Sequence, residues 1–250
     1  MSKYYTPKRK RNLYDPKSKD PYKLSRSGLE LFMECPRCFY IDKRLGTGRP
    51  PGFPFSLNAA VDNLLKKEFD ALRVKKEPHP LLKANGVDGI PAINDKLDEW
   101  RNNFKGVQHK HEKTNLLIYG AIDDILETPN GEYIVIEFKA TSKSEAITEL
   151  TADHHEGYKR QVEMYQWLLR KNGYKVSDTA YFFYCNGLRN EKSFDKKLEF
   201  DISIIPYKGS DAWVEEIIVN AHKCLMGENL PASNPDCDFC RYINATKSIS

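Results

Sequence analysis

Residues 120–140, with the sequence GAIDDILETPNGEYIVIEFKA, predict a hairpin of two β-strands. The pair Asn130-Gly131 predicts the turn, because it supplies the positive φ that a tight hairpin turn requires. Side chains alternate between the two faces of a strand, so Glu137 and Lys139 share one face of the second strand. The other face is apolar and consists of Ile134, Ile136 and Phe138. One face of this strand can therefore join a core, while the other ends in two charged residues.

The charged residues of the hairpin suggest a chemical role. A carboxylate and an ammonium at the end of an apolar strand are costly to bury without a partner or a task. Asp123, at the end of the first strand, is well placed to approach Glu137, whereas Asp124 should point to the opposite face. Two carboxylates beside Lys139 are typical of a phosphodiesterase site with an oxygen-liganded divalent metal. The alternative is a salt bridge between Glu137 and Lys139 at the strand edge, which is the better interpretation of an isolated pair.

A helix over residues 157–171 adds two polar side chains. Gln161 and Tyr165 are four residues apart and lie on one face of this helix. A tyrosine on an apolar stripe is usually a core residue, but a buried glutamine needs hydrogen-bond partners. The pair could therefore orient a lysine or a phosphate.

The remaining pattern predicts an α/β fold with a central mixed sheet flanked by helices, because a hairpin stands between helices and a further strand follows. The first strand of the hairpin is predicted at 114–126, and two further strands at 179–185 and 197–205. Helices are predicted from Ser25 or Ser27 and at 56–73, 95–104 and 211–226, the last capped by Ser210, and loops at 78–95 and 140–156.

Composition bounds the organisation of the chain. With 250 residues and 40% hydrophobic content, it can form one large domain. The net charge is +4, but residues 1–23 hold eight Lys or Arg against two Asp and so carry +6, which leaves −2 for the rest. A basic arm suits a polyanionic partner, although a solvated tail explains it equally well. We expect an arm at 1–23, one domain at 24–242 and a tail at 243–250.

No apolar run approaches the roughly 20 residues of a membrane span. The N-terminus also lacks the apolar segment of a secretory signal. We therefore expect a cytoplasmic protein without a membrane partner, whose cysteines are thiols or metal ligands rather than disulfides.

Four of the six cysteines form two C-x2-C pairs. The pairs are Cys35 with Cys38 and Cys237 with Cys240, and this regularity predicts a metal site. From spacing alone, a tetrahedral zinc ion is the expected occupant. Cys185 and Cys224 are expected to be small buried hydrophobic residues.

The set Gly120-x-x-Asp123, Glu137-Phe138-Lys139 and Gln161-x3-Tyr165 resembles the PD-(D/E)XK nuclease superfamily, specifically its RecB-like branch. This branch includes the four-cysteine exonucleases associated with CRISPR adaptation. The stretch SRSGLELFMECPRCFY, residues 25–40, is similar to the entry helix of the branch. The resemblance covers residues 24–242 and rests on the order and spacing of the motifs.

The resemblance implies an αβββαβ core and a role for each matching residue. Asp123 and Glu137 would hold one or two Mg²⁺ or Mn²⁺ ions, helped by the backbone carbonyl of Phe138. Lys139 would position or help deprotonate the attacking water. The Gln161–Tyr165 pair would orient the site and the substrate backbone.

One position departs from the branch, which usually places a histidine ligand in the helix before the hairpin. Asp62 stands there in this chain, in the stretch SLNAAVDNLLKKEF. A carboxylate suits Mg²⁺ or Mn²⁺, so Asp62 is a candidate further metal ligand. An exposed helix acid is an equal alternative, and the change could also mark an altered metal preference or weakened activity.

The resemblance also bears on the four cysteines. Many RecB-like nucleases hold a [4Fe–4S] cluster with one cysteine before the nuclease core and three after it. This chain has two and two, so Cys38 would replace the missing C-terminal ligand. We favour the cluster, with zinc as the alternative. Either group would clamp the two ends of the chain together.

Taken together, these features predict a Mg²⁺- or Mn²⁺-dependent deoxyribonuclease. The expected substrate is DNA that is single-stranded or has free ends, degraded by an exonuclease in DNA repair, recombination or phage or mobile-element DNA processing. The alternatives are a catalytically weakened nucleic-acid-binding protein of the same fold and a structure-specific endonuclease.

Overall fold

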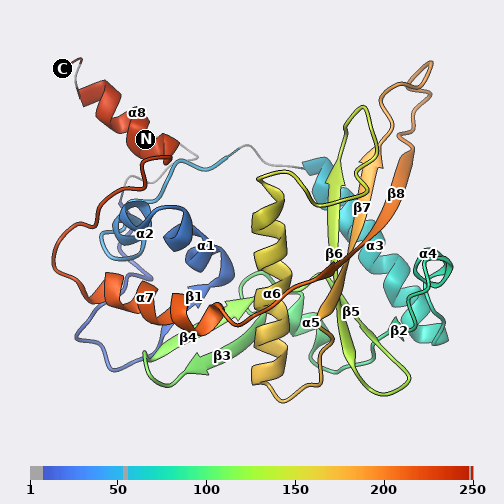
Figure 1. Cartoon of the computed structure of the whole chain (residues 1–250), viewed down its shortest axis with the longest axis horizontal. Coiled ribbons are helices and arrows are strands. Elements are labelled where there is room, and N and C mark those ends of the chain that lie inside the picture. The colour runs from blue at the N-terminus through green and yellow to red at the C-terminus, as the bar shows by residue number, and fades with distance from the viewer. Residues whose placement is uncertain (1–7, 53–55, 248, 250) are drawn as a thin grey trace. The chain divides into compact units, whose positions relative to one another are not determined.

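The structure is a computed structural model that describes residues 8–52, 56–247 and 249 (Figure 1). Contacts between residues divide the chain into two compact units. Their segments are 1–53, 108–119 and 212–250 for the first unit, and 54–107 and 120–211 for the second. The single domain that we expect over 24–242 stays a prediction.

The second unit is built on a five-stranded mixed sheet. In spatial order, its strands are β2 (Ile90–Pro91), β5 (Asp124–Glu127), β6 (Tyr133–Thr141), β7 (Thr179–Gly187) and β8 (Phe200–Lys208). Strands β6 and β7 are parallel, and the other neighbours are antiparallel. Its helices are α3 (Ser56–Lys75), α4 (Pro80–Ala84), α5 (Leu97–Trp100) and α6 (His155–Lys171). The predicted α/β class with a central mixed sheet flanked by helices is confirmed.

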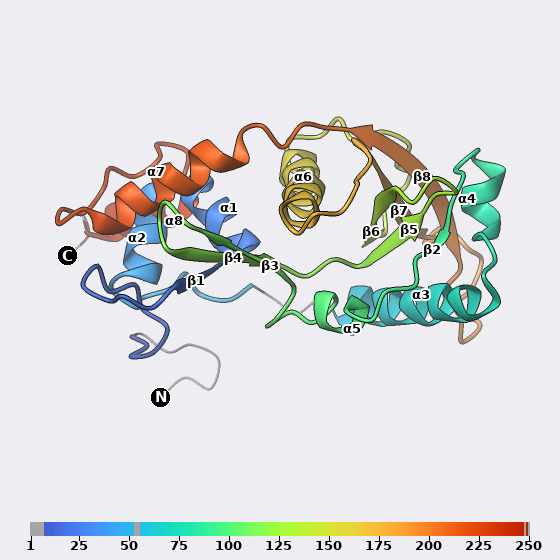
Figure 2. The same cartoon turned by 90° about the horizontal axis from the view of Figure 1, so that it is seen from below.

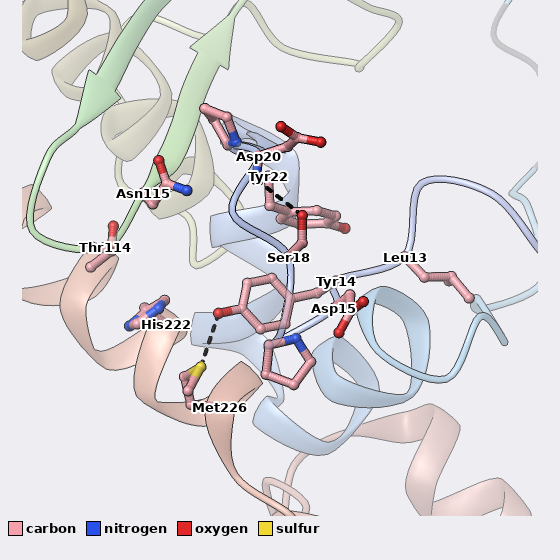
Figure 3. Close-up of a pocket in the computed structure, with 12 residues that line it drawn as sticks. Leu13, Tyr14, Asp15, Ser18, Asp20, Tyr22, Thr114, Asn115, His222 and Met226 are labelled. Atoms are coloured by element: carbon pink, nitrogen blue, oxygen red, sulfur yellow. Dashed lines mark hydrogen bonds between the residues drawn. The ribbon is translucent and has the colours of Figure 1, made fainter.

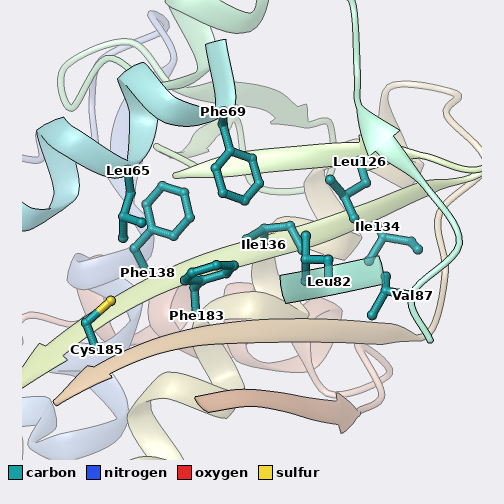
Figure 4. Packing of buried hydrophobic residues seen from close by; sticks show 10 residues of the cluster. All are labelled: Leu65, Phe69, Leu82, Val87, Leu126, Ile134, Ile136, Phe138, Phe183 and Cys185. Atoms are coloured by element: carbon teal, nitrogen blue, oxygen red, sulfur yellow. The ribbon is translucent and has the colours of Figure 1, made fainter. Parts of the chain in front are cut away.

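One face of this sheet packs against α3 and α4 (Figure 4). Phe69 of α3 is fully buried and contacts the rings of Phe138 and Phe183 edge-on, with centroid separations of 5.2 and 5.7 Å. The cluster consists of Leu65, Phe69, Leu82, Val87, Leu126, Ile134, Ile136, Phe138, Phe183 and Cys185. It contains the whole apolar face predicted for the second hairpin strand, so the alternation of β6 is as the sequence indicates.

Helix α6 lies on the opposite face of β6 (Figure 2). It is amphipathic, and its buried side includes Val162, Leu168 and Leu169. Because α3 already covers the apolar face of β6, the face that carries Glu137 is the one that meets α6. The helix thereby brings Gln161 to the charged end of the strand.

The first hairpin strand differs from the prediction of one strand over 114–126. The chain forms β4 (Leu116–Gly120), leaves it, and begins β5 at Asp124. The two strands join different sheets, because β4 pairs with β1 (Tyr22–Ser25) and β5 pairs with β6. Asp123 therefore lies in the connection just before β5 rather than at the end of a strand.

The last predicted helix begins later than expected. Helix α7 spans Val214–Met226, and its N-cap is Trp213, which makes no side-chain capping bond. Ser210 does not cap it, because it lies three residues before this N-cap; its backbone N–H instead donates to the carboxylate of Glu163 at 3.1 Å. Strand β8 is likewise shifted from the predicted 197–205, since its pairing with β7 continues to Lys208.

The first unit contains a three-stranded sheet in the order β1-β4-β3, with β3 at Val107–His111. Its helices are α1 (Arg26–Glu34), α2 (Pro36–Lys43), α7 and α8 (Asp238–Lys247). Ser25 caps α1 as predicted, since its Oγ accepts the backbone N–H of Gly28 at 3.0 Å. Helix α7 packs against α1 and α2. Within the described ranges, no helix combines the length and the apolar character that a bilayer span requires.

The described part of the basic arm contacts this unit. The guanidinium of Arg9 donates to Asp42 of α2 at 2.5 Å. Tyr14 stacks edge-on with Tyr22, and its hydroxyl donates to the sulfur of Met226 at 3.1 Å (Figure 3). Tyr14, Tyr22 and Met226 line a pocket of about 450 Å³ between the arm, the turn after β3 and α7. The flexible arm stays a prediction.

Candidate functional site

A buried carboxylate, that of Glu137, and a partly exposed one, that of Asp123, meet at the charged end of β6. Glu137 is 2% exposed, and its Oε1 accepts hydrogen bonds from Lys139 and Gln161, each at 2.6 Å. Its Oε2 is buried and has no hydrogen-bond partner within the part of the chain that the structure describes. Asp123 turns back toward this strand, where its Oδ2 accepts the backbone N–H of Phe138 at 2.8 Å. The structure thus brings together the acidic residues that the sequence predicts.

The electrostatics of this pair call for a cation. Burial, and next the charge of Glu137, raise the pKa of Asp123 to about 8, although Lys66 opposes the shift. A raised carboxyl pKa means that the two negative charges are under-compensated. With the unpartnered Glu137 oxygen, Asp123 offers hard oxygen donors of the kind that Mg²⁺ and Mn²⁺ prefer. The residues present therefore fit a divalent ion.

Lys139 is held beside the carboxylates by α6. Besides its bond to Glu137, its ammonium donates to Oε1 of Gln161 at 3.1 Å. It also lies 4.3 Å from the centre of the Tyr158 ring. The amide of Gln161 donates in turn to the hydroxyl of Tyr165 at 2.9 Å. Gln161 and Tyr165 thus reach the site as the four-residue spacing predicts, and they fix the position of the ammonium.

Gly120 has a packing reason in this arrangement. A Cβ on Gly120 would lie 2.7 Å from Cε1 of Tyr165. No real contact is that short, so a larger residue would displace the ring that supports Gln161. The glycine of the Gly120-x-x-Asp123 motif is therefore needed for close approach of α6.

Asp62, the candidate extra ligand, is engaged by a lysine. Its Oδ2 lies 2.8 Å from the ammonium of Lys66, one turn later on α3. The same ammonium lies 3.5 Å from Oδ1 of Asp123. Burial alone would lower the pKa of Lys66, but the charges of Asp123 and Asp62 outweigh it and raise that pKa. Lys66 was not predicted from the sequence, although its four-residue spacing from Asp62 could have indicated that the two side chains pair on one face of the helix.

These side chains line an open pocket of about 590 Å³. The pocket is formed by the start of α3, the end of β6 and the start of α6. Its charged lining residues are Asp62, Lys66, Asp123, Glu137, Lys139 and Lys143, with His154 beside them. A polar cavity of this kind can admit a phosphate-bearing chain.

The four cysteines of the two C-x2-C pairs converge in the first unit. Cys35 and Cys38 flank the start of α2, and Cys237 and Cys240 flank the start of α8. The Sγ–Sγ distances are 3.8 Å for Cys35–Cys240, 3.6 Å for Cys38–Cys237 and 3.7 Å for Cys38–Cys240. Among the described residues, this is the only group of three or more Cys, His, Asp or Glu whose ligand atoms all lie within 4.8 Å of one another. The cluster could hold a metal.

Neighbouring groups favour the thiolate at Cys35, whereas burial is the largest cause that raises the pKa of Cys38 and of Cys240. Burial would raise the pKa of Cys35, but hydrogen bonds from the backbone of Cys38 and Asn234 outweigh it and lower that pKa to about 7. The guanidinium of Arg49 also lies 3.5 Å from the sulfur of Cys237. Thiolate is the form that binds metals. Cys185 and Cys224 lie outside the cluster; Cys185 is buried and Cys224 is half-buried.

The model of one protein family, described as the PD-(D/E)XK nuclease superfamily, matches residues 23–245. The chain belongs to this superfamily. Membership suggests a metal-dependent nuclease, and such enzymes act on DNA as their substrate. The matched residues also include both cysteine pairs, so the cysteine cluster of this PD-(D/E)XK protein lies within the part of the chain that matches the family.

Other comparisons add little to this assignment. The solved structure titled "Crystal structure of SSO0001" is 15% identical, with 92% of this chain and 87% of that chain covered and a TM-score of 0.37. No curated protein matches the chain.

A buried ion-pair network supports the backbone of the PD-(D/E)XK site. Asp124 is fully buried, and its two oxygens accept from Arg73 and Arg101, each at 2.5 Å. Arg101 also donates to the backbone carbonyl of Asp123 at 3.1 Å. Asp124 therefore points away from the candidate metal site, as predicted, and the arginines hold the connection that carries Asp123.

Replacing Asp124 should destabilise the second unit. An Asp124→Ala change leaves two nearly buried guanidinium groups without their fully buried carboxylate partner, and breaking such a pair costs roughly 3–5 kcal/mol. Asp70 provides a matched control, because it pairs with the same two arginines but its side chain is 52% exposed. We expect Asp70→Ala to cost below about 1 kcal/mol. Urea unfolding of both variants measures this difference, and equal losses would refute the structural role of Asp124.

Proposed function

We propose that this PD-(D/E)XK protein is a Mg²⁺- or Mn²⁺-dependent deoxyribonuclease. Its preferred substrate is single-stranded DNA with a free end. The observation that carries the proposal is the unpartnered, buried oxygen of Glu137 beside Asp123 and Lys139. Two carboxylates that offer oxygen donors to a divalent ion, and a lysine at hydrogen-bond distance, are the groups that metal-assisted hydrolysis of a phosphodiester requires.

Each residue has a part in the proposed reaction. Asp123, Glu137 and the backbone carbonyl of Phe138 would hold the divalent ion. When bound, this ion lowers the pKa of the attacking water and compensates charge on the phosphate. Lys139 would orient this water through its ammonium and stabilise the hydroxide that forms; to accept the proton of the water it would first have to be the neutral amine. Gln161, backed by Tyr165, keeps the ammonium in place through the contacts described above.

Linear and circular single-stranded DNA test the proposed function. With Mn²⁺, we expect the protein to degrade end-labelled linear DNA and to leave circular DNA intact, because an exonuclease needs an end. Degradation of the circle would establish the structure-specific endonuclease instead. Binding of both substrates without cleavage would establish the nucleic-acid-binding alternative and would refute the enzyme.

For the cysteine cluster, the sulfur spacing favours zinc over the [4Fe–4S] cluster that we favour from the sequence. A tetrahedron with Zn–S bonds of about 2.3 Å has S–S edges of about 3.8 Å, close to the distances of 3.6–3.8 Å between these sulfurs. A cluster of four irons would need a wider set of thiolates. We expect a colourless protein with one zinc per chain by elemental analysis. A brown protein with iron and sulfide would reverse this assignment.

The wider setting is part of the same proposal. A thiolate metal site is typical of a reducing compartment, which supports a cytoplasmic location. The positive charge of residues 1–23 supports DNA as the partner. DNA repair, recombination and the processing of phage or mobile-element DNA are the pathways that use such an activity.

A further inference from the structure

The position of Lys66 bears on how many metal ions the site can hold. Its ammonium lies between two carboxylates, 2.8 Å from Asp62 and 3.5 Å from Asp123. The side chain is 21% exposed, so most of its length is packed within the unit. On the side of the pocket formed by α3, the ammonium of Lys66 therefore already lies between the carboxylates of Asp62 and Asp123.

The opposite side of the pocket offers different ligand atoms. There, among the described residues, Oε2 of Glu137 has no hydrogen-bond partner, and Oδ2 of Asp123 accepts the backbone N–H of Phe138. This side can accept an ion without breaking an ion pair. On the α3 side, an ion would have to displace the ammonium of Lys66 and would then face its repulsion.

The charges of the pocket agree with this division. Three carboxylates line it, those of Asp62, Asp123 and Glu137, together with two ammonium groups in direct contact with them, those of Lys66 and Lys139. Lys143 and His154 line the same pocket and add no negative charge. One divalent ion is enough to make the net charge of these five groups positive, and a second ion would make that net charge strongly positive.

We propose that the site binds a single divalent ion through Asp123 and Glu137, and that the ammonium of Lys66, held by Asp62, takes the place of a second ion. This inference rests on the proposed metal-dependent function and states how its site is occupied. Asp62 then acts as a positioning residue for Lys66 rather than as a metal ligand. The fixed ammonium supplies the positive charge on the α3 side of the phosphate.

Counting bound Mn²⁺ tests this proposal without an activity measurement. The sample is the full-length wild-type protein with its cysteine site already loaded with metal. Titration calorimetry, together with electron paramagnetic resonance of the free Mn²⁺, should show that each chain binds one Mn²⁺ ion. Lys66→Met should bind two, because Asp62 and Asp123 are then free to share an ion. Lys67→Met is the matched control, since Lys67 is exposed on the next position of α3 and should leave the count at one.

A second variant separates the two roles of Asp62. If Asp62 were a metal ligand, the Asp62→Asn change should weaken Mn²⁺ binding by at least about tenfold. If Asp62 instead only holds Lys66, the same change should alter the Mn²⁺ affinity by less than this. Two ions in the wild type, one in Lys66→Met, or a tenfold loss in Asp62→Asn would overturn the inference and leave the nuclease proposal standing. No Mn²⁺ bound to the wild type would instead refute the proposed function itself. Unchanged thermal midpoints would show that each variant is folded.

Discussion

A Lys139→Met protein should hydrolyse single-stranded DNA about 10²–10⁴-fold more slowly than the wild type, the range expected for loss of a proton-transfer group. It should nevertheless bind Mn²⁺ at least as tightly. The ammonium of Lys139 lies 2.6 Å from Glu137, so its removal takes a positive charge away from the metal ligands. Initial rates of degradation and calorimetric Mn²⁺ affinity measure the two effects separately.

Lys143→Met is the control for this experiment. Lys143 lines the same pocket, yet its backbone N–H is bonded to Asn186 and no ion pair links it to Glu137 or Asp123. We expect its rate to fall by less than about tenfold, since one exposed charge contributes mainly to DNA attraction. A Lys139→Met protein that keeps the wild-type rate would remove Lys139 from the reaction. One that loses Mn²⁺ binding would assign it to metal binding instead.

Replacing Cys35 by serine should unfold the first unit. The four cysteines connect the start of α2 with the start of α8, nearly the whole length of the chain apart. A structural zinc contributes about 10–16 kcal/mol to the folding of small zinc peptides, so its loss should exceed the stability of an ordinary domain. Circular dichroism melting and the metal content per chain are the measurements.

Cys224→Ser provides the matched control in the same unit. Cys224 is half-buried outside the cluster, and its sulfur donates to the backbone carbonyl of Pro36 at 3.9 Å. The variant should retain its metal and lose little stability. If Cys35→Ser kept both its metal and its melting midpoint, the cluster would not be a structural metal site.

The sequence predicts best where pattern and burial agree. The period-two alternation of β6 separates Ile134 and Phe138 from Glu137, and the structure buries the first two under α3. The spacing of Gln161 and Tyr165 likewise predicts one helix face, because α6 is long and amphipathic. In both elements, local geometry alone determines which side chains meet.

The contacts between residues far apart in the chain could not be predicted from the sequence. Lys66 and Arg101 reach the site region only through the packing of α3 and α5 beside the connection that carries Asp123. The break between β4 and β5 follows from the pairing of each strand with a different sheet. The cap expected of Ser210 was wrong because α7 begins only at Val214, with Trp213 as its N-cap.

The most direct test of the central claim compares the wild type with Glu137→Gln on labelled linear single-stranded DNA. The change keeps the shape of the side chain and removes the charge on its unpartnered oxygen. We predict degradation by the wild type with Mn²⁺, none after chelation with EDTA, and a rate lower by at least about 100-fold for Glu137→Gln. Equal rates for the two proteins, or no degradation by either, would contradict the account.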